Sequence, residues 1–493
     1  MKCFLASAVI VLSSLALFGQ AGPALAFDDY FIDRAMRIDL YQIGDAKEEI
    51  ITLDKIYQEG TWPENPNNLL EPFNNGSYAV KLYDLASDRM IYWRGFNSIF
   101  DEYRTTTPAL NGVKRTYQRS IHVPYPKHPV RLVIESRDRK NVLHPIFEQK
   151  VDPDGVDVIK ERVNAGDLIY PALKSGDPHR SVDLAFIAEG YTAAEQDKFK
   201  SDVDRFAGYL FNLEPYKKLK NKFNIYGVMR PSPESAMDEP QQHVFKKTIL
   251  NASFNALGTD RYMLTEENRL LRAIAGQVPY DALVVLVNSK RYGGGGIYND
   301  FCITTADNAI SNKVFVHEFG HSFAGLADEY YSSDVAYNDF YPKGVEPLEP
   351  NITALLDPTH VKWQDLLSPG IGVPTEYGKN QLESLQAERS RNNQEMRKET
   401  EQAKQNKASD ADLKAIQDKY AAKGKEIDAK MAAIRQQYAD LADKVGVFEG
   451  AGYASRGLYR PMMNCLMFSN AKDEFCLVCQ KAIARMIEYY SGQ

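Results

Sequence analysis

The sequence predicts an α+β protein with three parts, each indicated by its own pattern along the chain. Short strand-like runs between turn residues dominate residues 27–150, which we expect to form an N-terminal β-sandwich domain. Apolar strands alternate with helices across residues 165–493, as in an α/β domain. A proline-free segment at residues 378–444, rich in Gln, Lys, Glu and Ala, interrupts the second pattern and predicts an inserted helical hairpin.

Composition sets the first limits. With 493 residues, of which 44% are hydrophobic, the chain can build two or three separate cores. Its formal net charge is -7, so we expect no nucleic-acid partner.

Residues 1–26 have the pattern of a signal peptide. Lys2 supplies a short positive start, residues 4–18 are apolar, and Ala24-Leu25-Ala26 offers a small-x-small cleavage site. The alternative is an uncleaved membrane anchor. No later segment has an apolar run long enough to span a bilayer. We therefore expect a secreted or periplasmic protein without stable membrane insertion after cleavage.

Strands are expected in the first domain at residues 78–84, 90–95, 118–123 and 130–135. Pro124-Tyr125-Pro126 is expected to end the third of them. No catalytic set gathers in this domain, and its histidines are expected to be structural or exposed.

The second domain begins with a strand at residues 182–188. Thr192 and Glu195 have capping-box spacing, which predicts a helix through about residue 213. A buried strand is expected at residues 282–288. The glycine run at residues 293–296 is not followed by Lys-Ser/Thr or by a helix, so a phosphate loop is rejected. We expect a mobile turn there, before an edge strand at residues 297–304.

The second arm of the inserted segment carries apolar residues at alternating three- and four-residue steps, a heptad pattern typical of a coiled coil. These are Leu413, Ile416, Tyr420, Ile427, Met431, Ile434, Tyr438 and Leu441. Residues 404–411 favour a chain reversal, and Ser409 can cap the second helix. The alternative is a single solvated helix, because the first arm offers only Leu382, Leu385 and Met396. The hairpin could bind a protein partner.

His317 and His321 predict a metal site, because residues four apart share one face of a helix. Glu318, beside the first histidine, can act as a general base. Gly325 can end the helix in a left-handed conformation, after which the chain can bring Asp328 back as a third ligand. Two histidines, a carboxylate and one open position suit catalytic zinc (Zn²⁺). Glu329 is the alternative third ligand, and purely structural histidines are the alternative to a metal site.

Signal cleavage would leave Cys302, Cys465, Cys476 and Cys479. An even number of cysteines in an exported chain predicts disulfides, and sequence cannot choose among the three possible pairings. Cys476 and Cys479 have the spacing of half a zinc ribbon, but no second CxxC accompanies them. A disulfide is therefore favoured over a structural metal.

Several motifs resemble those of the IgA peptidase family of zinc metallopeptidases. They are His317-Glu318-x-x-His321-x-x-x-Gly325-x-x-Asp328-Glu329-Tyr330, the strand at residues 182–191, Gly450-Ala451-Gly452-Tyr453, Tyr459-Arg460-Pro461, Cys465-x-Met467 and Phe475-Cys476-x-x-Cys479. The resemblance covers most of residues 180–490. It implies a metzincin-like catalytic domain behind an N-terminal β domain, with Met467 in a methionine turn beneath the zinc. It also suggests that Tyr459 steadies the oxyanion, although Arg460 could do so, and a structural role for Tyr459 is an alternative.

The leading hypothesis is a secreted zinc-dependent metalloendopeptidase that acts on extracellular or envelope polypeptides. An extracellular binding or adhesion protein with a structural metal is one alternative, and a cell-wall peptidase or amidase is another. Glu318 favours an enzyme, because a structural zinc site has no use for a general base.

Overall fold

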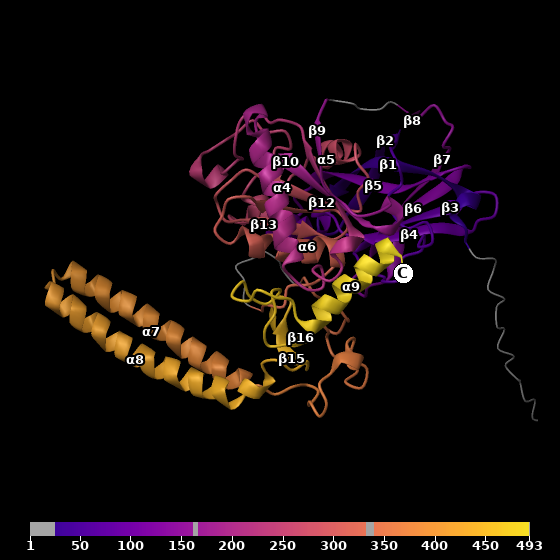
Figure 1. Ribbon diagram of the computed structural model, residues 1–493. Helices are drawn as coiled ribbons and strands as arrows, with labels where there is room; N and C mark the ends of the chain where they lie inside the picture. The colour runs from indigo at the N-terminus through magenta and orange to yellow at the C-terminus, as the bar shows by residue number, and fades with distance from the viewer. Residues whose placement is uncertain (1–24, 161–165, 332–339, 493) are drawn as a thin grey trace, which may run out of the picture.

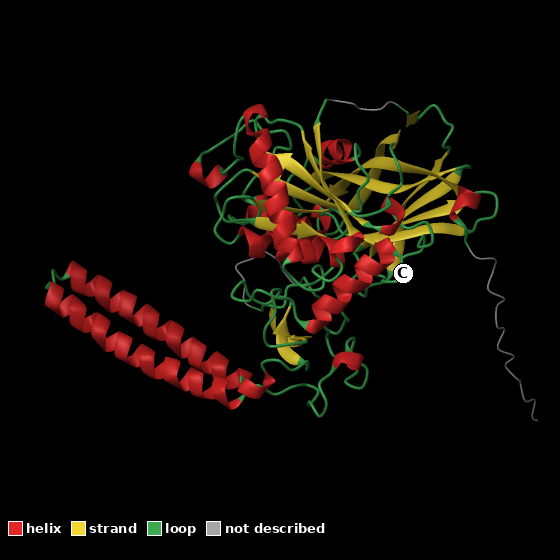
Figure 2. Cartoon of the chain, viewed as in Figure 1, coloured by secondary structure: helices red, strands yellow, loops and turns green. Residues whose placement is uncertain are grey.

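The computed structural model describes residues 25–160, 166–331 and 340–492. The expected signal peptide lies almost entirely outside the described residues. Two packed lobes carry a long pair of helices that projects away from them (Figure 1). Strands are concentrated in the two lobes, and helices form the projection (Figure 2). None of the described helices combines the length and the apolar character needed to cross a membrane.

The N-terminal lobe contains two four-stranded sheets that share one core. The first has the order β5-β1-β2-β8 and the second β4-β3-β6-β7. The strands are β1 (Phe31–Gly44), β2 (Glu49–Gln58), β3 (Tyr78–Asp84), β4 (Met90–Phe96), β5 (Arg115–Pro126), β6 (Val130–Arg137), β7 (Leu143–Val151) and β8 (Val158–Ile159), with short helices α1 (Phe27–Tyr30), α2 (Ile99–Tyr103) and α3 (Thr107–Leu110). Apolar side chains from both sheets, such as Ile38, Val80 and Leu132, pack into one cluster.

Strand β5 corrects one expectation. The Pro124-Tyr125-Pro126 segment was expected to end a strand, but β5 continues through Pro126 and pairs there with β1. Because β5 lies at the edge of its sheet, proline can occupy it without breaking an interior ladder.

The second lobe is built on a six-stranded sheet with the order β13-β14-β12-β10-β11-β9. The inner strands β14, β12, β10 and β11 are parallel, whereas the two edge strands β13 and β9 are antiparallel to their neighbours. The strands are β9 (Leu168–Lys174), β10 (Val182–Glu189), β11 (Phe223–Met229), β12 (Ala282–Val287), β13 (Gly294–Ile297) and β14 (Phe301–Thr305), and a separate hairpin joins β15 (Phe448–Ala451) to β16 (Ala454–Arg460).

Helices cover one face of this sheet, and the N-terminal lobe helps to cover the other. Side chains of α4 (Gln196–Phe211), α6 (Ser311–Ala324) and α9 (Leu477–Ser491) pack with Leu184 and Phe186 on the first face. On the second face, α5 (Asn268–Ala275) packs with Ala185 and Ile187, together with Phe100 of the N-terminal lobe. The two lobes therefore share a continuous apolar interface.

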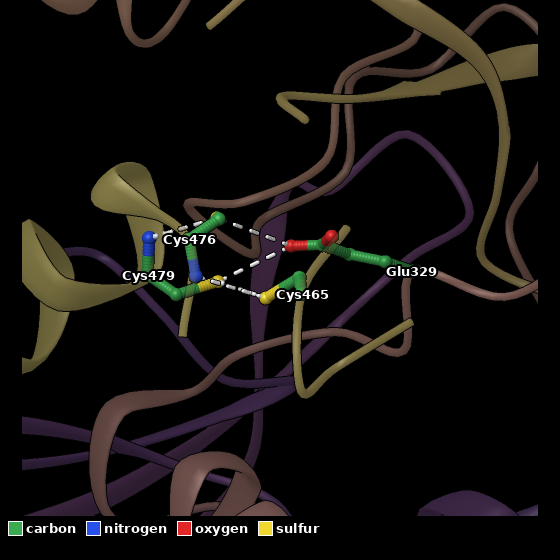
Figure 3. Close-up of side chains that lie close together, drawn as sticks. All are labelled: Glu329, Cys465, Cys476 and Cys479. Carbon is green, nitrogen blue, oxygen red and sulfur yellow. Dashed lines mark hydrogen bonds between the residues drawn. The ribbon is translucent and has the colours of Figure 1, made fainter. Parts of the chain in front are cut away.

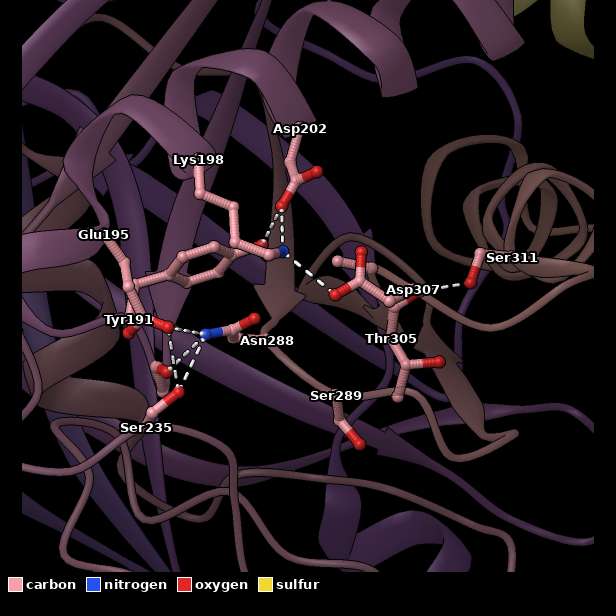
Figure 4. A network of polar contacts seen from close by, with 12 residues as sticks. Tyr191, Glu195, Lys198, Asp202, Ser235, Asn288, Ser289, Thr305, Asp307 and Ser311 are labelled. Atoms are coloured by element: carbon pink, nitrogen blue, oxygen red, sulfur yellow. Dashed lines mark hydrogen bonds and ion pairs between the residues drawn. The ribbon is translucent and has the colours of Figure 1, made fainter.

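Polar side chains at the carboxyl ends of the inner strands hold α4 and the start of α6 (Figure 4). The Tyr191 hydroxyl donates to Asp202 Oδ2 at 2.8 Å, and Lys198 Nζ lies 2.6 Å from Asp202 and 3.0 Å from Asp307. Ser311, the first residue of α6, donates to the last backbone carbonyl of β14. This network gives α6 a fixed starting point.

The projecting pair of helices is formed by α7 (Lys379–Gln405) and α8 (Asp410–Gln437), which run side by side and antiparallel (Figure 1). Ser409 caps α8 in a capping box with Asp412. Tyr420, Ile427 and Met431 of the heptad pattern are buried. Polar contacts between the two helices add to this apolar packing.

Two of these polar contacts are made by side chains of α7 that are not apolar. Asn392 of α7 is buried and donates to the Tyr420 carbonyl at 3.0 Å. The Arg389 guanidinium pairs with Asp428 and lies over Gly424, where an added Cβ would be 2.6 Å from Arg389 Nη1. These contacts explain why the first arm needs so few apolar residues.

Candidate active site

Helix α6 brings His317 and His321 together, as the four-residue spacing predicts. Their Nε2 atoms lie 3.1 Å apart, and the rings meet edge to face. On the opposite side of the helix, Phe315, Phe319 and Phe323 are buried in the core. This packing fixes the helix rotation that points both histidines out of the core.

Gly325 ends α6 in the left-handed conformation that the sequence predicts, with φ of 61°. Its N–H donates to the His321 carbonyl, and the next N–H donates to the Gly320 carbonyl. The chain then reverses and brings Asp328 to the histidines. Asp328 Oδ1 lies 3.0 Å from His317 Nε2 and 3.4 Å from His321 Nε2.

These three atoms have the geometry of one face of a metal tetrahedron. With zinc–ligand distances of about 2.0–2.1 Å, two ligand atoms of a tetrahedral site lie about 3.3 Å apart. The observed separations of 3.0, 3.1 and 3.4 Å match that value. Asp328 Oδ1 is also buried, and no donor in the described part of the chain makes a well-aligned hydrogen bond to it. The residues present fit a zinc ion.

Neighbouring carbonyl and hydroxyl groups orient the side chains of His317, His321 and Asp328. His317 Nδ1 lies 3.2 Å from the Leu466 carbonyl, and His321 Nδ1 lies 2.6 Å from the Leu326 carbonyl. With a proton on each Nδ1, both Nε2 lone pairs face the shared centre. The Tyr453 hydroxyl donates to the other carboxylate oxygen of Asp328. The sequence alone assigned Tyr453 no role, although Tyr453 ends the motif Gly450-Ala451-Gly452-Tyr453.

Burial and neighbouring charges shift the pKa values of this cluster. Burial alone would raise the pKa of Asp328, but the two histidines outweigh it and hold that pKa well below the ordinary value. Burial is the largest influence on the Glu318 carboxyl and raises its pKa, while the neighbouring histidines oppose it. Glu318 therefore lies in a site that lacks the usual solvation of a carboxylate.

The glycine run forms strand β13, which lies directly against Glu318. This corrects the expected mobile turn: Gly294–Ile297 pair antiparallel with β14 as the edge strand itself. A Cβ on Gly294 would lie 2.6 Å from Val314 Cγ1 and 2.9 Å from Glu318 Cγ. A Cβ on Gly296 would lie 2.3 Å from the Glu318 carbonyl oxygen. Only glycine allows β13 to approach α6 this closely.

Met467 lies beneath the helical turn between the two histidines. A Cβ on Gly320 would lie 3.2 Å from Met467 Sδ. The Met467 carbonyl accepts a hydrogen bond from the Glu329 N–H at 2.8 Å. The preceding residue supplies the carbonyl that contacts His317 Nδ1. This loop therefore supports both the histidine helix and the Asp328 segment.

A cleft of about 1190 Å³ passes over the histidines and Glu318. The N-terminal lobe contributes Asn75 to its lining, and the base of the α7–α8 pair contributes Met431 and Arg435. Because both lobes and the helical pair meet there, an extended ligand would contact all three parts of the molecule.

Arg460 lines the cleft, whereas Tyr459 does not. Tyr459 lies on β16, where its backbone pairs with Thr353 and Glu449, and its side chain is not among those lining the cleft. Arg460 does line the cleft and donates to the Gly450 carbonyl at 2.6 Å. This geometry does not favour the proposed oxyanion role of Tyr459.

Glu329, the alternative third ligand, points away from the histidines toward the cysteines. Its Oε1 lies 3.2 Å from Cys479 Sγ and 3.7 Å from Cys476 Sγ. The expected disulfides are not formed: the four cysteines at 302, 465, 476 and 479 are free thiols in the structure. Cys302 lies in β14 and belongs to the core on the α6 face.

Comparison with known proteins gives two family-level matches that together span most of the chain. Residues 171–487 match the model described as IgA Peptidase M64. Residues 26–148 match the model described as Peptidase M64 N-terminus. No curated protein matches the chain.

Proposed function

Because the chain belongs to the IgA peptidase M64 family, and so to the peptidases, we propose that it hydrolyses peptide bonds with a zinc ion held by His317, His321 and Asp328. The observation that carries this proposal is the triangle of two histidine nitrogens and one carboxylate oxygen, with sides of 3.0, 3.1 and 3.4 Å. The methionine loop beneath it supports a metzincin-like arrangement. Membership in a peptidase family favours an enzyme over an adhesion protein.

A zinc ion at this position supplies a Lewis acid that lowers the pKa of water to about 7 and polarises the carbonyl to be attacked. Glu318 is the general base: it accepts a proton from the attacking water and returns it to the leaving amine. Burial raises the pKa of Glu318 above its ordinary value, which makes the carboxylate a stronger base toward water. Strand β13 holds its side chain from one side.

Asp328 acts as a ligand rather than as a second base. Its pKa lies well below the ordinary value, so the carboxylate is ionised, and Tyr453 donates a hydrogen bond to its outer oxygen. With both carboxylate oxygens engaged, Asp328 keeps a fixed orientation.

The shape of the cleft supports an endopeptidase. Its lining comes from both lobes and from the base of the α7–α8 pair, so a polypeptide could pass through with residues on both sides of the metal site. The inserted pair of helices would then contact parts of a protein substrate that lie outside the cleft. We place this activity outside the cytoplasm, on the basis of the signal-like first 26 residues.

Cleavage of an unbiased peptide library tests this function. The purified protein should cut internal bonds in peptides with both termini blocked, as detected by mass spectrometry. A zinc chelator should abolish cleavage, and added zinc should restore it. Cleavage that persists in the chelator would contradict the zinc mechanism, and cleavage restricted to free termini would contradict the endopeptidase assignment.

A further inference from the structure

A second group of ligand-type side chains lies close together in the structure (Figure 3). It comprises Glu329, Cys465, Cys476 and Cys479, whose ligand atoms all lie within 4.8 Å of one another. The four residues come from three segments: the chain after Asp328, the methionine loop and the start of α9. All four are buried, with Glu329 and Cys479 fully inaccessible.

The distances within the group correspond to a tetrahedral zinc site. A zinc–sulfur distance of about 2.3 Å places two sulfurs of a tetrahedron about 3.8 Å apart, and a sulfur and a carboxylate oxygen about 3.5 Å apart. Cys465 Sγ and Cys479 Sγ are 3.8 Å apart. Glu329 Oε1 lies 3.2 and 3.7 Å from Cys479 Sγ and Cys476 Sγ. One cation would reach all four atoms.

The Glu329 carboxylate needs a positive partner. Asn351 donates to its Oε1 at 3.1 Å, whereas Oε2 is buried without a hydrogen bond among the described residues. Among the described residues Arg460 attracts its charge, but the two side chains form no ion pair. A buried carboxylate without a counter-charge is costly by several kcal/mol in general, and a bound cation removes that cost.

Backbone amides also point at the sulfurs. The N–H groups of Cys476 and Met467 donate to Cys465 Sγ at 3.2 and 3.4 Å, and the Cys479 N–H donates to Cys476 Sγ at 3.5 Å. Such donors favour thiolate over thiol, and thiolate is the form that binds metal. Cys476 also occupies the N-cap of α9, where the helix dipole favours negative charge.

We propose that Glu329, Cys465, Cys476 and Cys479 bind a second, structural zinc ion. Three thiolates and one carboxylate fill all four positions of a tetrahedron, so the site is closed and non-catalytic. A disulfide between two of the cysteines would use two sulfurs and leave the third thiol and the buried carboxylate without a partner. A bound zinc ion gives all four side chains a partner. The proposal of this structural site does not depend on the proposed peptidase mechanism.

The second zinc would hold in place the two chain segments that position the active-site residues. Glu329 directly follows the ligand Asp328, and Cys465 directly precedes Leu466, whose carbonyl contacts His317 Nδ1. Cross-linking these segments to α9 fixes both the third ligand and the loop under the histidines. Cys465, Cys476, Cys479 and Glu329 are therefore positioning residues for the catalytic site, and none of them is placed to touch substrate.

Zinc counting separates the two sites. Elemental analysis of the purified wild-type chain should give two zinc ions per chain, and the His317→Ala/His321→Ala variant should retain one. Adding Cys479→Ser to that variant should remove the remaining ion. Cys302→Ala is the matched control, because Cys302 is a buried free cysteine outside the cluster, and it should keep both ions. An unchanged zinc content in the Cys479→Ser variants would overturn the proposal.

Spectroscopy of the wild-type chain keeps the test decisive if the cysteine variants fail to fold. X-ray absorption at the zinc edge should detect sulfur neighbours at about 2.3 Å. Mass spectrometry after thiol alkylation of the unfolded, chelated protein should label all three cluster cysteines. A single zinc with only nitrogen and oxygen neighbours, or a disulfide among Cys465, Cys476 and Cys479, would overturn the proposal.

Discussion

Asp328 and Glu329 are consecutive residues whose carboxylates face different centres. Asp328 Oδ1 lies 3.0 Å from His317 Nε2, whereas Glu329 Oε1 lies 3.2 Å from Cys479 Sγ. Both carboxylates are buried, and the Glu329 N–H is anchored to the Met467 carbonyl between the two centres. A small movement of this dipeptide would therefore disturb both groups of ligand-type side chains.

Replacing Asp328 by Ala should remove one zinc ion per chain, because two histidines alone leave the site without its third protein ligand. Peptide hydrolysis should be lost together with that ion. Zinc analysis and a peptide assay measure the two effects. Asp357→Ala, at an exposed carboxylate, is the control and should change neither. Full zinc retention in Asp328→Ala would show that another residue completes the site.

Replacing Gly294 by Ala should impair catalysis while leaving zinc bound. The added Cβ would lie 2.9 Å from Glu318 Cγ, so the general base or the strand must move. A displacement of about 1 Å can lower a rate by about 10²-fold. The measurement is kcat together with zinc content. Gly208→Ala is the matched control, because a Cβ there meets no atom within 4 Å. Equal kcat values for the two variants would refute the contact between β13 and Glu318.

Shortening the α7–α8 pair should change the cleavage of large proteins without changing the hydrolysis of small peptides. Deleting residues 393–419 and joining the ends by a short Gly-Ser link keeps the Asn392–Tyr420 contact and the base that lines the cleft. We expect unchanged zinc and small-peptide hydrolysis, with altered cleavage of large proteins.

The Arg435→Ala variant is the comparison for this truncation. Arg435 lines the cleft at the base of the helical pair, so its loss should affect small peptides as well. If the shortened chain loses its zinc or does not fold, the outer part of the pair belongs to the catalytic core. The interpretation of residues 378–444 as a separable insertion would then be wrong.

Glu64 should make stability depend on pH. Glu64 and Glu71 share the buried Arg94 guanidinium, at 2.8 and 3.8 Å. Burial raises the pKa of Glu64 to about 7, against the opposing effect of Arg94. An unfolded Glu titrates near pH ~4.3, so the folded state binds this proton more tightly. The contribution of Glu64 to the free energy of unfolding is complete below about pH 4.3. It is lost as the pH rises to about 7.

Glu64→Gln should remove that dependence. Urea unfolding from pH 4 to pH 8 should show the wild type losing stability relative to the variant as the pH rises toward neutrality. Glu488→Gln, at an exposed residue, is the control and should follow the wild type. A constant difference between wild type and Glu64→Gln across this range would contradict the raised pKa.

Local signals in the sequence predicted much of the geometry of the candidate site. The i, i+4 histidines and the left-handed Gly325 are short-range features, and both appear as expected. Strand β3 has the predicted bounds, because its alternating pattern and its turn are local as well. The capping box at Thr192 also forms.

Features that depend on distant partners could not be predicted in this way. Glu329 meets cysteines that lie far along the chain, and nothing in a half zinc ribbon indicates a glutamate as its fourth member. The glycine run looked like a turn because glycine lowers strand propensity, whereas close packing on α6 requires it. In α7, Asn392 and Arg389 supplement the few apolar residues that were expected to face the partner helix, and their role depends on that helix.

The rate and zinc content of Glu318→Gln, measured on the same preparation, test the central claim most directly. Gln keeps the shape of the side chain but cannot accept the proton from water. We predict a fall in kcat of about 10²–10⁴-fold on a cleavable peptide, with the same number of zinc ions per chain as wild type. Undiminished turnover in Glu318→Gln would contradict the proposed zinc-peptidase mechanism.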